Sequence, residues 1–251
     1  MAKQLGMVNF RGSIGDMTYV KTEDGYHVRR KSSLDKARVL TDKKFAGSRR
    51  ASTEFGAAAT YGKLLRTAVL GTLRNEGDSK LHSRMLKFMY DILKTDTASA
   101  HGKRRPDLGR FEMLSGFEFN IKNELVRTLL VQYRAHVDRA AGEAVIEFPA
   151  FEPREDLLVP EGATHFKCLS AAAELDFKRN KLSVTTAESE YFAVRANEIA
   201  PFTLSQHFSP AGTLPVILVL GIRFYDLVNG NYNQLHADDF NAVRIVAVDQ
   251  V

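Results

Sequence analysis

The chain has 251 residues, of which 44% are apolar and 26% are charged, and this composition is typical of a globular protein with a sizeable core. Its single cysteine, Cys168, excludes an intrachain disulfide and a zinc site built from cysteines. Residues 1–110 hold 23 Lys and Arg against 11 Asp and Glu, a formal +12, whereas residues 111–251 hold 12 against 19, a formal −7. The net charge of +5 therefore hides two parts of opposite sign, which can attract each other, a polyanion or a second copy.

The chain has no obvious membrane or export signal. Residues 1–30 contain no apolar run of signal-peptide length, and the longest apolar run, 216–220, is too short to cross a bilayer. We therefore expect synthesis in the cytoplasm without a signal peptide and no membrane insertion. The sequence does not predict the final location of the protein, and an extracellular or virion-like assembly is one alternative.

Residues 1–31 are predicted to form an N-terminal arm with a β-hairpin. Apolar and polar residues alternate over 16–21 and again over 25–30, and Asp24-Gly25 between them is a strong turn signal. An isolated hairpin is not stable in water, so we expect this one to lie on another surface, in its own chain or in a neighbour. Five residues are assigned to this assembly hairpin: Gly12, Gly15, Tyr19, Gly25 and Tyr26. The alternative interpretation is a floppy leader whose glycines only make turns.

Residues 32–110 are predicted to be a basic helical region. Thr41-Asp42 is a plausible N-cap, apolar residues recur at helical spacing from Phe45 to Leu73, and Asn75-Glu76-Gly77 is a plausible end. Gly56 and Gly62 predict either tight packing against a neighbour or a break near Gly56. A second helix, capped by Asp78 or Ser79, should bury one face, and the short connection predicts that the two helices are antiparallel neighbours. That face comprises Leu81, Met85, Phe88, Met89, Ile92 and Leu93.

Residues 111–251 are predicted to form an acidic β-sandwich domain. Short runs of strand-forming residues alternate with turn signals such as Ala141-Gly142 and Asn229-Gly230. The run 214–220 is apolar on both faces and should be a central strand, with a bulge or a close approach at Gly221. The predicted strands lie at 117–121, 130–136, 144–148, 164–172, 174–178, 181–186, 191–195, 202–206, 214–228 and 243–247. The expected fold class is α+β: an N-terminal β-hairpin and helical pair followed by an antiparallel β-sandwich, Ig-like or jelly-roll-like.

No motif in the sequence predicts catalysis. The seven histidines are scattered singly, without the spacing that places two metal ligands on one helix face. The segment 56–63 lacks the spacing of a phosphate-binding loop, and 12–15 lacks the spacing of an esterase elbow. The acidic pairs Glu188/Glu190 and Asp238/Asp239 are interpreted as surface carboxylates rather than as part of a hydrolytic dyad. We predict no enzyme activity, no catalytic or metal-binding residues and no cofactor, and the sequence identifies no small-molecule substrate.

The segment 29–50 is the one strong candidate for binding, because it carries nine Lys and Arg against two Asp. Cations at this density displace counterions from nucleic acid, and they can equally pair with an acidic protein surface. The alternative is a solvated or acid-paired linker, and pairing with the acidic domain is the form that we favour. The candidate contacts are Arg29, Arg30, Lys31, Lys43, Lys44, Arg49 and Arg50, followed at a distance by Arg104 and Arg105.

The order of these features resembles a group of uncharacterised Bacteroidota proteins with a Gly-x-x-Gly hairpin, an Arg-rich helix and a β-sandwich. The resemblance covers most of the chain and implies no known activity, which makes a conventional enzyme less expected. The matching residues are Gly12-Ser13-Ile14-Gly15, Tyr19, Asp24-Gly25-Tyr26, Arg29, Phe55-Gly56, 62–68, 116–120 and Thr164-His165-Phe166.

Two functions follow from the sequence. The first is a non-enzymatic structural subunit that self-assembles through head-to-tail contacts, as in a filament, tube, shell or phage-like particle, with copies of itself as partners. The alternative is a non-specific nucleic-acid-binding or packaging protein that uses the basic segment 29–50.

Overall fold

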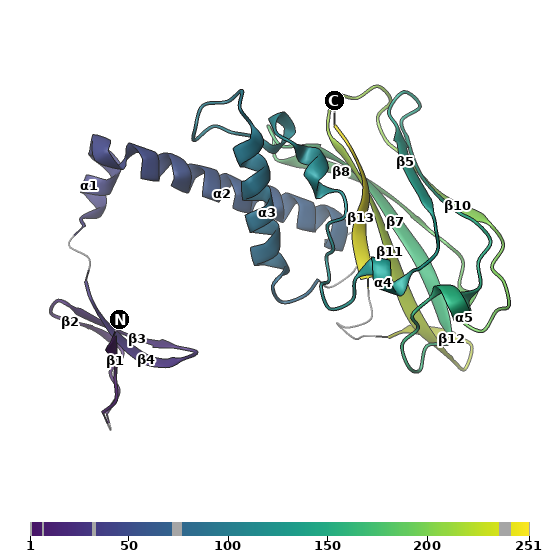
Figure 1. The fold of residues 1–251 in the computed structure, drawn as a ribbon, viewed down its shortest axis with the longest axis horizontal. Coiled ribbons are helices and arrows are strands. Elements are labelled where there is room, and N and C mark those ends of the chain that lie inside the picture. The colour runs from purple at the N-terminus through teal and green to yellow at the C-terminus, as the bar shows by residue number, and fades with distance from the viewer. Residues whose placement is uncertain (1, 7, 32–33, 72–76, 236–241, 251) are drawn as a thin grey trace. The chain divides into compact units, whose positions relative to one another are not determined.

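One strand, β11 (Val216–Val228), lies at the centre of the larger sheet (Figure 1). The computed structural model describes residues 2–6, 8–31, 34–71, 77–235 and 242–250. Strand β11 pairs along one edge with β7 and along the other with β13 and then β12, and every pairing is antiparallel. This six-stranded sheet contains β7 (His165–Asp176), β8 (Lys181–Glu188), β9 (Phe192–Ala193), β11, β12 (Asn231–Gln234) and β13 (Ala242–Asp249).

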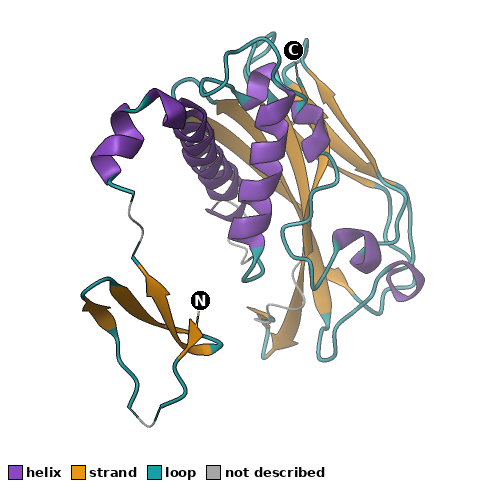
Figure 2. Ribbon diagram, turned by 60° about the vertical axis from the view of Figure 1, so that its left-hand side comes forward, coloured by secondary structure: helices purple, strands orange, loops and turns teal. Residues whose placement is uncertain are grey.

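The two faces of β11 are covered by different layers. Ile217 and Val219 join a cluster formed with helical residues, whereas Leu218 and Leu220 join a second cluster on the opposite face. The second cluster is closed by a three-stranded antiparallel sheet in the order β10-β6-β5. Its strands are β5 (Arg134–Asp138), β6 (Glu143–Phe148) and β10 (Phe202–His207). The region is therefore a β-sandwich whose outer face is covered by helices (Figure 2).

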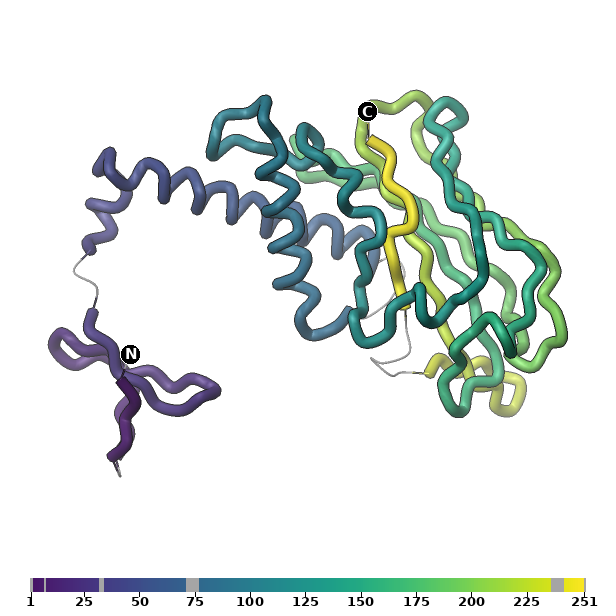
Figure 3. The backbone as a smooth tube through the Cα atoms, in the orientation of Figure 1, coloured from purple at the N-terminus to yellow at the C-terminus, as the bar shows by residue number. Residues whose placement is uncertain are grey.

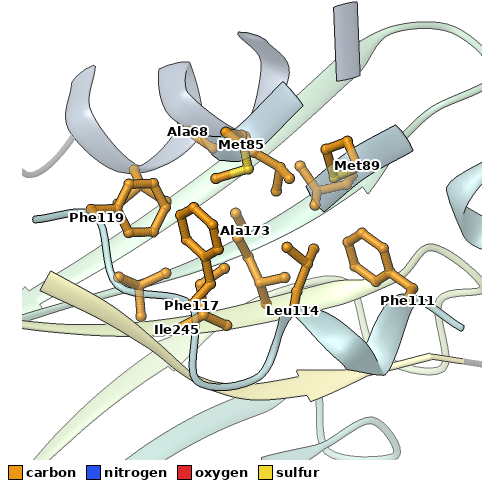
Figure 4. Packing of buried hydrophobic residues seen from close by; sticks show 14 of the residues in the cluster. Ala68, Met85, Met89, Phe111, Leu114, Phe117, Phe119, Ala173 and Ile245 are labelled. Atoms are coloured by element: carbon orange, nitrogen blue, oxygen red, sulfur yellow. The ribbon is translucent and has the colours of Figure 1, made fainter. Parts of the chain in front are cut away.

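Two helices supply the covering layer. Helix α2 (Ala46–Arg66) continues into a π-helical turn, η2 (Thr67–Gly71), and α3 (Leu81–Thr95) follows. Helix α3 is strongly amphipathic, and the face that it buries meets apolar side chains of the sheet (Figure 4). The buried residues of α3 are Leu81, Met85, Met89, Ile92 and Leu93. Four short helical turns complete this part of the chain: η3 (Pro106–Leu108), η4 (Phe111–Leu114), α4 (Leu125–Thr128) and α5 (Pro153–Asp156).

The N-terminal residues form a separate four-stranded antiparallel sheet in the order β1-β4-β3-β2. The chain path can be followed in Figure 3. The strands are β1 (Ala2–Lys3), β2 (Gly12–Ile14), β3 (Met17–Thr22) and β4 (Gly25–Arg30), and α1 (Lys36–Thr41) and the 3-10 turn η1 (Lys43–Phe45) follow them. Contacts divide the chain into two compact units, residues 1–50 and 51–251, which we call the arm and the body.

The expected fold class is confirmed as mixed α+β with an N-terminal hairpin, a helix pair and a β-sandwich-like C-terminal region. The hairpins at β3–β4 and β11–β12 are present, and Asn229 and Gly230 both have positive φ, as a tight turn of this kind requires. The contacts between residues place one domain boundary, between Arg50 and Ala51, whereas the changes in sequence composition predict domain boundaries after residues 31 and 110. The difference arises because α2 and α3 share a core with the sheet.

Several details differ from the sequence-based expectation. Helix α3 crosses α2 instead of lying antiparallel along it (Figure 1), because both helices pack on the broad sheet. Helix α2 has no break at Gly56, which is exposed and has no atom within 4 Å of a Cβ position. Gly62 does serve packing, since a Cβ there would lie 3.2 Å from Met85 Cγ. The segments 164–172 and 174–178 belong to one strand, β7.

Other expectations fall on short or undescribed segments. The segment 117–121 is not a full strand, although Phe119 N donates to the Val243 carbonyl oxygen of β13 at 2.8 Å. The region expected to be all β also contains α4 and α5. The predicted helix end at Asn75-Glu76 lies outside the described residues.

We predict that Met89→Ala destabilises the whole body by about 2–5 kcal/mol, because Met89 is fully buried where α3 meets the sheet. The measurement is urea unfolding followed both by far-UV circular dichroism and by tyrosine fluorescence. Both signals should shift together. Lys87→Ala, on the exposed side of α3, is the control and should change little. Separate transitions for helix and sheet would contradict the shared core.

Candidate assembly interface

The register of the arm sheet separates its side chains into two chemically different faces. Directly paired residues of an antiparallel ladder share a face, and successive residues alternate. Ile14 pairs with Met17, and Tyr19 pairs with Val28 and with Gly12. One face is therefore mainly apolar, with Lys21 and Arg30 on the same side. Its apolar members are Ala2, Ile14, Met17, Tyr19, Tyr26 and Val28.

The opposite face is mainly polar, with Val20 as its apolar member opposite His27. Ser13 pairs with Thr18, and Thr18 pairs with Arg29, while Lys3 pairs with His27. The sheet is thus amphipathic in the way that sheets are when one side rests on a core and the other meets water. We call the side that carries Met17 and Tyr19 the apolar arm face.

The apolar arm face has no cover within the arm. No described residue of the arm is buried, and Ile14, Met17 and Phe10 keep 59%, 40% and 51% of their surface exposed. Among the described residues of the arm, aromatic packing is local, between the Phe10 and Tyr19 rings, whose centroids lie 5.8 Å apart. An exposed contiguous apolar face on a folded sheet is a mark of an interaction surface.

The five residues predicted for the assembly hairpin lie in this sheet. Tyr19 and Tyr26 are on the apolar arm face, and Lys21 Nζ lies 5.6 Å from the centroid of the Tyr26 ring. Gly15 makes the β2–β3 turn with φ of 53°, a conformation that favours glycine. Gly25 is the first residue of β4, after a turn at Glu23-Asp24, so Asp24-Gly25 is not the central pair of that turn. The sequence analysis did not include Ile14 in the assembly hairpin. Ile14 lies two residues after Gly12, and the period of two in a strand would have placed both on the same face.

The basic residues of the arm divide into engaged and exposed groups. Arg49 Nη1 donates to the carbonyl oxygens of Val39 and Asp42, each at 2.8 Å, and so stabilises the end of α1. Arg30 makes an exposed ion pair with Asp16 at 3.7 Å. The other candidate contacts of the arm are exposed, and none pairs with a carboxylate in the part of the chain that the structure describes. They are Arg29, Lys31, Lys43, Lys44 and Arg50.

The two candidate arginines of the body serve the body itself. Arg104 Nε lies 3.7 Å from the carboxylate of Glu54, which is 2% exposed and also accepts a hydrogen bond from Gly102 N at 2.7 Å. Arg105 pairs with Asp107 at 3.0 Å. Both side chains are about three-quarters covered, so their structural role accounts for them. Arg104 and Arg105, which the sequence suggests as contacts with a partner, are therefore already paired with carboxylates of the body.

The body has a hollow of about 370 Å³ beside α4. Val126, Leu130, Tyr133 and Arg244 line it. Behind Arg244 lies the carboxylate of Glu118, whose Oε1 is 3.6 Å from Arg244 Nη1 and whose Oε2 accepts from Leu125 N at 3.1 Å. Glu118 thereby satisfies a backbone donor at the start of α4 and holds this helical turn in place.

Burial raises the pKa of Glu118 to about 7, because loss of solvent outweighs the Arg244 charge and the hydrogen bond from Leu125. The folded state therefore retains a proton that the unfolded chain releases at lower pH. Between the ordinary value of 4.5 and about 7, the unfolding free energy should fall as the pH rises.

We predict that Glu118→Gln removes this dependence. The amide oxygen can still accept from Leu125 N, but the side chain no longer ionises, so the variant should gain stability relative to wild type as the pH rises from 5 to 8. Thermal unfolding across that range measures the difference. Glu112→Gln, at an exposed carboxylate paired with Arg110, is the control. A constant difference between Glu118→Gln and wild type across the range would contradict the assignment.

The remaining residues with reactive or metal-binding side chains do not form a site among the described residues. Cys168 is fully buried, and burial raises the pKa of its thiol to about 12, so it is not a reactive thiolate. Within the described residues no group of three or more His, Cys, Asp or Glu side chains could hold a metal ion. Asp238 and Asp239 lie outside those residues. Nor do the described helices include one with the length and apolarity needed to cross a bilayer.

Comparison of the chain with protein-family models, with curated proteins and with solved structures finds no match. The resemblance to Bacteroidota proteins with a Gly-x-x-Gly hairpin therefore stays a prediction.

Proposed function

We propose that the chain is a non-enzymatic structural subunit that assembles with copies of itself, and that the arm makes the contact. The observation that carries this proposal is an ordered amphipathic sheet in a unit none of whose described residues is buried. Ordering the backbone costs about 1–2 kcal/mol per residue, and burial of apolar side chains normally offsets that cost. A sheet whose apolar residues are at best half-buried, as Tyr19, Tyr26 and Val28 are, needs a surface to complete it.

The charge distribution supports the same proposal. The arm holds 12 Lys and Arg against 5 Asp and Glu, and the acidic part of the chain lies in the body. A cationic arm and an acidic segment, residues 111–251 with a formal −7, suit a contact between unlike surfaces of neighbouring copies. Such heterologous contacts close into rings or continue as filaments, so a filament, a tube, a shell or a phage-like particle are all products of the proposed subunit.

The test is the mass of the protein in solution as a function of concentration, by light scattering after size-exclusion chromatography. We expect association in the wild type and at least about a tenfold weaker association in Ile14→Asp/Met17→Asp, because two charges on the apolar arm face oppose its burial. Ser13→Asp/Thr18→Asp is the matched control: the two residues are paired next to Ile14 and Met17 but lie on the opposite face. A wild type that remains a monomer at every concentration and at both low and high salt would refute the proposal.

A second function, non-specific binding of nucleic acid, is favoured by the exposed cations of residues 29–50. Five of the candidate residues have no carboxylate partner among the described residues, and the exposed Lys36 adds another cation to the same segment. Arg38 is exposed too but pairs with Asp42 at 3.5 Å. Lysine and arginine in this state release counterions when they meet a phosphate backbone. A packaging protein would combine this property with self-assembly.

For this function we predict a logarithmic salt dependence of DNA or RNA binding whose slope falls by about 2–3 when Lys43, Lys44 and Arg50 are replaced by Gln. Fluorescence anisotropy with a labelled oligonucleotide at several salt concentrations measures the slope. Replacement of three exposed cations of the body, Lys178, Arg179 and Lys181, is the control and should leave the slope unchanged. Equal effects of the two triple variants would exclude the arm as the binding segment.

A further inference from the structure

One arginine of the body is buried without a partner for its charge. Arg223 lies on β11 and keeps only 7% of its surface exposed. Its Nε and Nη2 atoms are closed to solvent and have no hydrogen-bond partner among the described residues. A guanidinium stays protonated in a folded protein, and burial of an unpaired charge is strongly destabilising. The described part of the chain therefore does not neutralise this cation.

The two unpartnered atoms form one edge of the guanidinium. The N–H of Nε and the nearer N–H of Nη2 point in the same direction from this planar group. Two oxygens at the spacing of a carboxylate or a phosphate accept both hydrogen bonds at once, which is the usual bidentate geometry of arginine. We call this edge the Arg223 fork.

The nearest polar neighbours of Arg223 do not supply the missing negative charge. Lys167 of β7 is directly opposite Arg223 in the strand pairing, so two like charges share one face of the sheet. Lys167 Nζ already pairs with Glu188 Oε2 at 2.8 Å. Tyr225 is two residues further along the same face. Burial raises the pKa of Tyr225, although a hydrogen bond from Arg223 acts in the opposite direction, so its hydroxyl stays protonated at neutral pH.

The charges of this cluster match a monoanion. Arg223 and Lys167 contribute +2 and Glu188 contributes −1, which leaves +1 when His165 on the same face is counted as neutral. A carboxylate carries −1 and balances the cluster. A phosphate ester carries about −1.5 to −2 at pH 7 and would leave excess negative charge in a buried place.

Exposed aromatic side chains border the cluster. The ring centroid of Tyr191 lies 5.0 Å from that of Tyr225 and 4.5 Å from Lys167 Nζ, and the ring of Tyr232 stacks on Tyr191 at 3.8 Å. Tyr191 and Tyr232 keep 38% and 39% of their surface exposed. Exposed side chains change rotamer within nanoseconds, so a ligand can reach the Arg223 fork by displacing a ring, without a change in the backbone. The same rings offer an apolar surface to the ligand.

We propose that Arg223 is the anchor of a binding site for an organic monocarboxylate with an apolar body. The two carboxylate oxygens accept hydrogen bonds from Nε and Nη2 of Arg223, and the apolar body lies against Tyr191. Because the Arg223 fork is closed to water, these hydrogen bonds are stronger than they would be at the surface. The site is complete within one copy and uses no residue of the arm, so it does not depend on self-assembly.

The experiment measures thermal unfolding of the full-length protein at pH 7 in sodium benzoate and in sodium chloride of equal ionic strength. The dependence of the midpoint on benzoate concentration gives the dissociation constant, which we expect to be about 1–10 mM. Arg223→Lys keeps the charge but removes the fork, and it should weaken binding at least about tenfold. Arg195→Met, at an exposed arginine, is the control and should bind benzoate as the wild type does. Equal stabilisation by benzoate and chloride, or tighter binding of inorganic phosphate than of benzoate, would overturn the proposal.

Arg223→Met gives a second readout, in chloride alone. The variant should be at least as stable as the wild type, because an apolar chain of similar length replaces a buried unpaired charge. A marked loss of stability would mean that the chain itself neutralises Arg223, and the proposal would then be wrong.

Asp238→Asn/Asp239→Asn tests two acids that lie outside the described residues. This variant should bind benzoate with the affinity of the wild type. Binding at least about tenfold tighter than in the wild type would show that one of these aspartates competes for the Arg223 fork, which would also exclude the proposed ligand site.

Discussion

The body depends on one constraint: β11 is apolar on both faces and must be covered on both. Residues 216–225 of this strand are all buried. A strand of this kind cannot lie at the surface of a two-layer sandwich, so a third layer is needed, and α2 and α3 supply it. This covering layer is held by the close approach of Gly62 and Met85 and by two aromatic pairs. The pairs are Phe88 with Phe117 and Phe111 with Phe177.

The arm presents the opposite situation. Its sheet has one mainly apolar face and one mainly polar face, as do sheets that rest on a core, but the described residues of the arm form no layer that covers the apolar face. The body completes its own hydrophobic packing and the arm does not. This contrast, more than the net charge, is what supports an assembly function, because apolar burial contributes more to a stable contact than exposed ion pairs do.

Much of the arm could be read from its sequence. The period-two alternation of Met17, Tyr19, Tyr26 and Val28 predicts the hairpin and its apolar side, since pairing of neighbouring strands through a short turn is a local event. The β1 and β2 strands were not predicted, because each is only two or three residues long and owes its conformation to pairing with β4 and β3. The exposed apolar residues beside α4 were not predicted to lie together either. Val126 and Leu130 are ordinary apolar residues in the sequence, and only the bridge between Leu129 and Leu157 brings Leu158 beside them.

The sequence by itself determined the mixed α+β class, the central position of β11, the buried face of α3 and the charge contrast, because each of these follows from residue type and spacing along one element. Only the tertiary structure decided which lysine and arginine side chains remain exposed and unpaired among the described residues. Arg49, Arg104 and Arg105 have the same chemistry as Lys43 and Arg50, but they find carbonyl or carboxylate partners and the other two do not. Partners such as Glu54 for Arg104 lie many residues away in the sequence. A local sequence pattern cannot predict such a contact, because the contact depends on how the whole chain packs.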